Sequence, residues 1–352
     1  MEDLANQVAD IVEDYRNDDG IEMSSDRILQ WANQFEPGDR AFVLEETKNI
    51  LSQRYVTKST GLKFLKLGVE KLAESYNYRS PSAFLKNTVL LDLQEEGKSQ
   101  KALLEMLDGV ARKHWGINSS DFASSSKTNY LYIDDVLCTG NTLFYDLKDW
   151  LAAGGNQRVE QGANIILLYI FVHTLNTGKL KGRFYYADEV SDGFDYNLIS
   201  ACTVENDYEN KNADLDLAFP LRQNQPEAVF DYLNRIDSPL DESVFRAPGR
   251  PRDEKLFSSP DNRIRYENIL LSEGLSILDS VNVSKENVRP LGYTLPTHKT
   301  LGFGTLSFTW RNVPNNTPLV FWYSAPEWKP LFKNKRLDPP LSSRSFSIAD
   351  FL

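Results

Sequence analysis

The chain has 352 residues, of which 41% are hydrophobic and 25% charged, and a formal charge of −11. These values are typical of a globular protein with room for two or three domains. The negative charge argues against unspecific nucleic-acid binding by the whole surface. Two distant cysteines, Cys138 and Cys202, exclude a disulfide framework and favour a reducing compartment. No apolar run approaches the ~20 residues of a membrane span, and no signal-peptide core is present, so we expect a cytoplasmic protein without a membrane partner.

The N-terminal segment, residues 1–78, has the pattern of a small helical cap. Apolar residues recur there at helical spacing in four stretches, and Pro37-Gly38-Asp39 ends the second of them. The four stretches cover residues 4–15, 25–35, 42–51 and 62–76. Nothing in this segment points to chemistry, so its expected roles are packing and partner contact.

The following residues predict the first strand and helix of an α/β core over residues 79–215. Thr88–Leu91 is a short apolar run that suits a strand, and a helical pattern begins at Ala102. The loop between them suits an anion-binding helix N-terminus, with an ordinary helix start as the alternative. A nucleotide-binding P-loop is excluded, because its first glycine would occupy the position of Asp92. The loop residues that we expect to contact an anion are Gly97, Lys98 and Ser99.

The stretch Tyr130–Trp150 has the pattern of a strand, a tight loop and a helix. Two carboxylates, Asp134 and Asp135, follow the apolar strand, and they suit either two sugar hydroxyls or a hydrated metal ion. Unpaired N–H groups and the dipole of a helix N-terminus favour an anion, and glycine lets the backbone approach it closely. We therefore expect a ribose phosphate site; the alternative is a buried strand whose acids cap the helix. The phosphate loop would consist of Cys138, Thr139, Gly140, Asn141 and Thr142.

The run IDDVLCTGNTL, residues 133–143, resembles the phosphoribosyl pyrophosphate (PRPP) motif of the type I phosphoribosyltransferases. The resemblance implies that Asp134 and Asp135 hold the ribose and Mg²⁺, and that residues 138–142 hold the 5′-phosphate. It also implies that Gly97–Ser99 binds pyrophosphate and that the polar segment Ser119–Lys127 closes over PRPP. Purine-salvage members often carry an acid at the position of Cys138, so a purine substrate is in doubt.

The remaining sequence predicts further strands, helices and turns. Asn164–His173 is apolar throughout, as a strand buried on both faces of a parallel sheet would be. We expect strands over 183–190, 305–310 and 319–322, a turn over 314–317 and a helix over 260–278. The basic loop Arg246–Arg252 is expected to be exposed, with contact to a phosphate or an acidic partner as the alternative.

Two further segments, RILQWANQF at 27–35 and GFGTLSFTWRNVPNNTPLVFW at 302–322, resemble a bacterial group of phosphoribosyltransferase-like proteins found in conflict and anti-phage systems. This resemblance implies an effector of antiviral defence. Its expected partners are a retron reverse transcriptase and the RNA–DNA product of that enzyme.

Together these patterns predict an α/β fold: a phosphoribosyltransferase-type, mostly parallel sheet flanked by helices, with the N-terminal helical cap and a C-terminal α+β region over 216–352. The expected function is a phosphoribosyltransferase-like enzyme that binds Mg–PRPP and cleaves or transfers at the anomeric carbon. The alternative is a module without catalysis that senses PRPP or a nucleotide, or contacts a protein.

Overall fold

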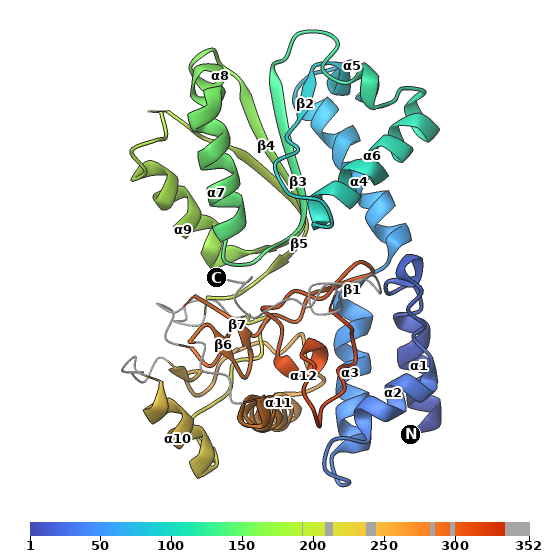
Figure 1. Cartoon of the computed structure of the whole chain (residues 1–352), viewed down its shortest axis with the longest axis vertical. Coiled ribbons are helices and arrows are strands. Elements are labelled where there is room, and N and C mark those ends of the chain that lie inside the picture. The colour runs from blue at the N-terminus through green and yellow to red at the C-terminus, as the bar shows by residue number, and fades with distance from the viewer. Residues whose placement is uncertain (192, 208–213, 237–243, 282–285, 296–299, 335–352) are drawn as a thin grey trace. The chain divides into compact units, whose positions relative to one another are not determined.

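The computed structural model describes residues 1–352 except for 192, 208–213, 237–243, 282–285, 296–299 and 335–352 (Figure 1). The chain forms two compact units. Unit 1 comprises residues 1–55, 218–248 and 254–352, and unit 2 comprises residues 56–217 and 249–253. This grouping differs from the three consecutive segments of the sequence analysis, since residues 56–78 belong with the sheet and residues 1–55 with the C-terminal third.

Unit 2 is built on a parallel sheet with the strand order β2-β3-β4-β5. The strands are β2 (Thr88–Leu90), β3 (Asn129–Leu137), β4 (Asn164–His173) and β5 (Asn197–Val204). In the centre of the sheet Asn129 pairs with Asn164 and Leu137 with Val172. The apolar runs at 88–91, 130–133 and 164–173 thus form strands as predicted, and the prediction of an α/β fold with a mostly parallel sheet is confirmed.

Helices cover both faces of this sheet, with α4, α5 and α6 on one side and α7, α8 and α9 on the other (Figure 1). On one face Tyr132 and Tyr169 pack in a buried cluster with Leu147 of α7 and Leu180 of α9. On the opposite face Gly68 of α4 is so close to the sheet that a Cβ there would lie 3.1 Å from Leu168. The helices are α4 (Lys58–Ser75), α5 (Pro81–Lys86), α6 (Ser99–Trp115), α7 (Asn141–Trp150), α8 (Asn156–Glu160) and α9 (Thr174–Tyr185), with a π-helical turn at Leu151–Gly155 and a 3₁₀ turn at Ser119–Asp121.

The expected strand over 183–190 is wrong. Helix α9 begins directly after β4 and continues to Tyr185, so the segment starts as the last turn of a helix. Tyr185 and Tyr186 are each 82% exposed. An exposed pair of this kind would not fit a buried strand, and aromatic content alone could not separate the two structures.

Unit 1 joins the first 55 residues to the C-terminal third through a shared core. The Trp31 indole donates to the carbonyl of Val320 at 2.9 Å, and the Tyr15 hydroxyl donates to that of Lys333 at 2.7 Å. Trp31 also stacks on Phe321 with ring centroids 5.7 Å apart. The helices of this unit are α1 (Glu2–Ile11), α2 (Ser25–Ala32), α3 (Arg40–Arg54), α10 (Glu227–Arg235), α11 (Pro260–Val281) and α12 (Leu319–Trp322), with a 3₁₀ turn at Asn17–Asp19.

The remaining strands are short: β1 (Tyr55–Val56), β6 (Val288–Arg289), β7 (Gly292–Tyr293) and β8 (Phe308–Thr309). The expected strand over 305–310 is reduced to β8, and the expected strand over 319–322 is instead helix α12. Four consecutive apolar residues show no period, so their burial inside unit 1 was predictable but their conformation was not. The turn over 314–317 is confirmed by a hydrogen bond from Thr317 N to the Pro314 carbonyl at 3.0 Å.

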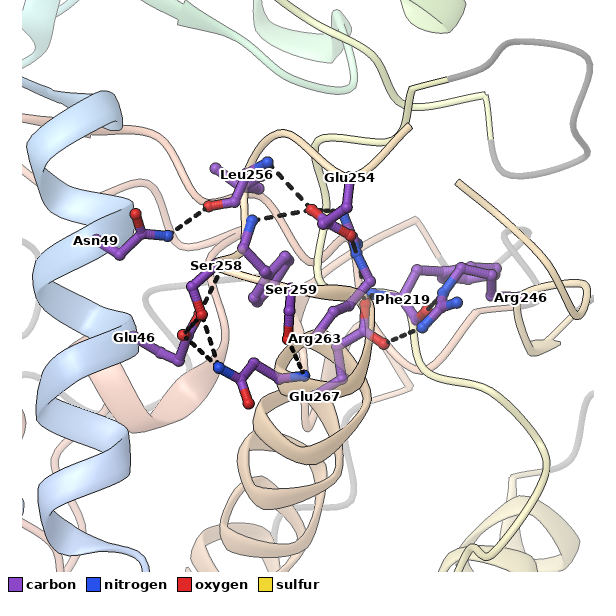
Figure 2. A network of polar contacts seen from close by, with 12 residues as sticks. Glu46, Asn49, Phe219, Arg246, Glu254, Leu256, Ser258, Ser259, Arg263 and Glu267 are labelled. Atoms are coloured by element: carbon purple, nitrogen blue, oxygen red, sulfur yellow. Dashed lines mark hydrogen bonds and ion pairs between the residues drawn. The ribbon is translucent and has the colours of Figure 1, made fainter. Parts of the chain in front are cut away.

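A network of buried ion pairs lies at the N-terminal end of α11 (Figure 2). Arg246 donates to Glu267 at 2.6 Å and to the Phe219 carbonyl at 2.8 Å. Arg263 pairs with Glu267 at 3.1 Å and also with Glu254. All four charged side chains are at most 5% exposed. The expectation that the loop 246–252 is exposed is therefore wrong for Arg246.

Among the described residues, no helix combines the length and the apolar character that crossing a membrane requires.

Candidate functional site at the carboxyl edge of the sheet

Three helices of unit 2 begin at the edge where the parallel strands end. Helix α6 follows β2, α7 follows β3 and α9 follows β4. Each N-terminus brings N–H groups without an intrahelical partner and partial positive charge to that edge. The N-terminus of α9 is occupied by the protein itself, since Leu175 N donates to Asn206 Oδ1 at 2.9 Å. The N-termini of α6 and α7, on neighbouring strands, are the ones that the sequence predicted to bind an anion.

The two predicted carboxylates lie at the end of β3 in different environments. Asp134 is 7% exposed, whereas Asp135 is half-buried. The Asp134 carboxylate accepts hydrogen bonds from Asp135 N at 2.9 Å and from Gln94 Nε2 at 2.9 Å. The Ser99 side chain is near enough to lower the pKa of this carboxyl, so Ser99 and Asp134, both predicted from sequence, lie near each other.

Burial, and next the neighbouring Asp135 carboxylate, raise the pKa of the Asp134 carboxyl to about 7. Ser99, the Asp135 N–H and Gln94 oppose this rise, because they stabilise the ionised form. A strongly perturbed carboxyl group at the carboxyl edge of a parallel sheet is a common property of a functional site.

The predicted phosphate loop is a tight turn into α7. Gly140 adopts a φ of 75° and precedes Asn141, the first residue of the helix. Among the described residues, the only acceptor seen for the first three N–H groups of α7 is Thr139 Oγ1, 3.4 Å from Asn141 N. Thr142 is exposed and Thr139 is half-buried. Among the described residues, the N–H groups of Thr142 and Leu143 thus have no acceptor within the protein.

Cys138 begins this turn but is only 7% exposed. Burial, together with Asp135 and Asp134, raises the pKa of its thiol well above the ordinary value. A thiol with a raised pKa stays protonated at neutral pH, so it does not supply the negative charge of a carboxylate at this position.

The second predicted loop, Gly97–Ser99, ends in α6. Gly97 has a φ of 83°, Lys98 is the residue before the helix and Ser99 is its first residue. The charge of Lys98 also acts on Asp146 of α7: burial raises the pKa of Asp146, and Lys98 is among the groups that lower it. Lys98 therefore lies near enough to α7 for its charge to act there.

Sequence reasoning missed three side chains that join these loops. Gln94 Nε2 lies 2.7 Å from the Tyr132 hydroxyl, which donates to Asp146 Oδ2 at 2.6 Å. The burial of Tyr132 could be predicted, because it is part of the apolar strand 130–133. Gln94 and Asp146 gave no signal, because a single glutamine in a loop and a single aspartate on a helix occur in every protein.

His173, at the end of β4, is fully buried, and its Nδ1 lies 2.8 Å from the Leu137 carbonyl. It thus ties the end of β3, where the phosphate loop starts, to the neighbouring strand. The segment Ser119–Lys127 lies elsewhere: Ala123 N and Ser125 N donate to the carbonyls of Leu85 and Lys86, which precede β2. This contact is at the amino ends of the strands, so the structure contradicts the expectation that the segment covers the ligand.

The two carboxylates, Asp134 and Asp135, fit a magnesium ion only if a bound substrate supplies some of its ligands. Among the described residues there is no cluster of three or more His, Cys, Asp or Glu side chains that could hold a metal ion. Magnesium usually needs only one or two carboxylates when phosphates of a substrate supply the other ligands. Asp134 and Asp135 meet that requirement.

A separate open cavity of about 530 Å³ is lined by residues of α4, of the loop between α4 and α5 and of α6, among them Arg79 and His114. It also includes Tyr78, whose hydroxyl accepts from Asn129 at the first position of β3. The cavity is therefore at the amino ends of the strands. We assign the functional site to the opposite edge, where ligands of parallel α/β sheets bind.

No curated protein and no solved structure matches the chain. The family model PRTase-CE matches residues 28–334. This match covers most of the chain and agrees with the parallel sheet of unit 2. The chain therefore belongs to the PRTase-CE family and is a phosphoribosyltransferase-like protein.

Proposed function

We propose that the carboxyl edge of unit 2 binds the ribose 5-phosphate part of Mg–PRPP and that the protein cleaves or transfers at the anomeric carbon. One observation carries this proposal. A glycine with positive φ, Gly140, turns the chain into α7 just after the strand that carries the two carboxylates, and this arrangement suits a phosphate next to two sugar hydroxyls.

Each part of the ligand has a matching group. The N–H groups at the start of α7, with the hydroxyls of Thr139 and Thr142, would hold the 5′-phosphate. Asp134 and Asp135 would accept from the ribose hydroxyls and stabilise positive charge that develops on the sugar ring. Lys98 and the N-terminus of α6 would hold the pyrophosphate. Bound Mg²⁺ would neutralise charge on the leaving pyrophosphate.

The test is pyrophosphate release from PRPP in the presence of Mg²⁺, with water or candidate bases as acceptors. We expect release by the wild type and a loss of at least about a hundredfold in Asp135→Asn, which keeps the side-chain shape but removes the charge. Absence of release by the wild type with every acceptor would contradict catalysis.

A binding module without catalysis is the second candidate, and Cys138 favours it. Its buried, protonated thiol stands where purine-salvage enzymes often carry an acid. This candidate predicts saturable binding of PRPP by calorimetry that is lost in Asp135→Asn, with no pyrophosphate released by either protein.

The proposed setting is a cytoplasmic effector of antiviral defence, with a retron reverse transcriptase and its RNA–DNA product as partners. It is supported by the resemblance of residues 27–35 and 302–322 to such proteins. Phage plaque counts with and without the neighbouring genes test it, and equal counts in every combination would remove the idea.

A further inference from the structure

Four polar side chains form one hydrogen-bonded chain that connects the loop after β2, strand β3 and helix α7. Gln94 is in the loop after β2, Tyr132 and Asp134 are on β3, and Asp146 is on α7. Gln94 is 9% exposed, Tyr132 is fully buried and Asp134 is 7% exposed. Polar groups buried this deeply are stable only when they are hydrogen-bonded to one another.

The contacts fix the direction of the Gln94 amide. Its nitrogen faces two oxygens, the Tyr132 hydroxyl at 2.7 Å and Asp134 Oδ2 at 2.9 Å. Tyr132 gives its own hydrogen to Asp146, so its oxygen is free to accept from Gln94. A flipped amide would place its carbonyl against the Asp134 carboxyl group, where neither group can donate while Asp134 is ionised.

Gln94 is itself held firmly. Gln100 of α6, which is fully buried, accepts at its Oε1 from the backbone of Leu93 at 2.7 Å and of Gln94 at 2.9 Å. The loop after β2 is therefore anchored to α6 through the backbone of Leu93 and Gln94, and to Asp134 through the side chain of Gln94.

The Asp134 carboxylate is shared between the protein and any ligand. A carboxylate offers about four lone-pair directions; Asp135 N occupies one at Oδ1 and Gln94 Nε2 occupies one at Oδ2. The nearby Ser99 side chain also stabilises the ionised carboxylate. A ligand that engages Asp134 must share the carboxylate with Gln94.

We infer that Gln94 is a positioning residue that orients Asp134 and links the occupancy of this carboxylate to the loop Asp92–Lys98. The inference rests on the proposed function for the identity of the ligand. The Gln94 side chain couples the ribose site to the loop that is expected to hold pyrophosphate. A ligand held at Asp134 should make that loop more rigid.

The first arm of the test uses the full chain without ligand. Gln94→Met keeps the length of the side chain but cannot donate, and Gln157→Met is the matched control on the exposed helix α8. Hydrogen exchange of the backbone amides of residues 93–98 should be about tenfold faster in Gln94→Met than in the wild type, and unchanged in the control. Unchanged exchange in Gln94→Met would overturn the inference.

Tyr132→Phe is a second variant for the case that Gln94→Met does not fold. It removes one of the two acceptors of Gln94, so we expect hydrogen exchange at residues 93–98 to be faster than in the wild type, but by less than in Gln94→Met. If Gln94→Met is unfolded, exchange in Tyr132→Phe equal to that of the wild type would overturn the inference.

The second arm adds ribose 5-phosphate, which lacks the pyrophosphate that would touch the loop directly. In the wild type we expect slower exchange at residues 139–143 and also at 93–98. In Gln94→Met the protection at 139–143 should remain and that at 93–98 should be lost; protection of both segments in this variant would overturn the link. Absence of protection at 139–143 in the wild type contradicts the proposed function instead, and the first arm still decides whether Gln94 holds the loop.

Discussion

At the scale of single residues, the site depends on charge placed where water cannot reach it fully. Asp134 is 7% exposed and has another carboxylate as its chain neighbour. Burial and like charge both penalise the ionised form. A protein that keeps such a group at the end of its central strand gives up stability for it, which is common at binding sites.

This cost can be measured as a pH dependence of stability. Because the folded pKa of Asp134, about 7, lies above the ordinary value of 3.8, its contribution to the free energy of unfolding falls as pH rises between these values. Asp134→Asn has no titrating group at this position, so its free energy of unfolding does not fall for this reason. In EDTA, the stability of Asp134→Asn relative to the wild type should therefore rise by about 2–3 kcal/mol between pH 5 and pH 8. Urea unfolding at the two pH values checks this, and a constant difference would contradict it.

Gly140 allows a second prediction at this scale. Gly140 has a φ of 75° and Gly162 a φ of 83°, so alanine at either position should cost about 1 kcal/mol of stability. Only Gly140 lies in the proposed phosphate loop. Calorimetry with ribose 5-phosphate should show affinity at least about tenfold weaker in Gly140→Ala and unchanged in Gly162→Ala. Equal affinities in the two variants would exclude this loop as the phosphate site.

At the scale of elements, helix α11 carries both buried and exposed ion pairs. Glu267 is fully buried between Arg246 and Arg263 (Figure 2), whereas Asp279 and Arg235 are each 60% exposed. Removing one charge from a buried network leaves the remaining charges without compensation.

Glu267→Gln should therefore lower the free energy of unfolding by about 3–5 kcal/mol. Asp279→Asn, the same chemical change on the same helix, should lower it by less than about 1 kcal/mol. Chemical denaturation of the two variants gives the comparison. Similar losses would show that the network of Figure 2 does not stabilise unit 1.

How far the sequence predicts these elements depends on the range of the interactions that fix them. The strands at 130–133 and 164–173 and the turn into α7 were predictable, because local patterns of apolar residues and glycine determine them. The link from Gln94 to Asp134 spans 40 residues, and that from Arg246 to Glu267 spans 21. Such contacts leave no local pattern, so Gln94 went unnoticed and Arg246 was expected to be exposed.

At the scale of the whole molecule, the two units differ in how the chain builds them. Apart from residues 249–253, unit 2 is one continuous stretch, 56–217, with its own sheet and helices on both faces. Unit 1 is made from both ends of the chain. The continuous unit should therefore fold without the rest.

We expect a fragment of residues 56–217 to give dispersed amide resonances and cooperative thermal unfolding. A fragment of residues 1–55 should lack both properties, because Trp31, Phe35 and Tyr15 contact Phe321, Trp328 and Phe332 in the intact protein. A cooperatively folded fragment 1–55 would contradict this account of unit 1.

The composition of unit 1 from both chain ends has a consequence for biosynthesis. The first 55 residues leave the ribosome long before their packing partners at 319–332 have been translated. During that interval Trp31 and Phe35, both almost fully buried in the finished protein, have no surface to cover them. The nascent chain therefore carries an exposed aromatic face until residues 319–332 have been made, and a chaperone that recognises such faces should bind it during that interval.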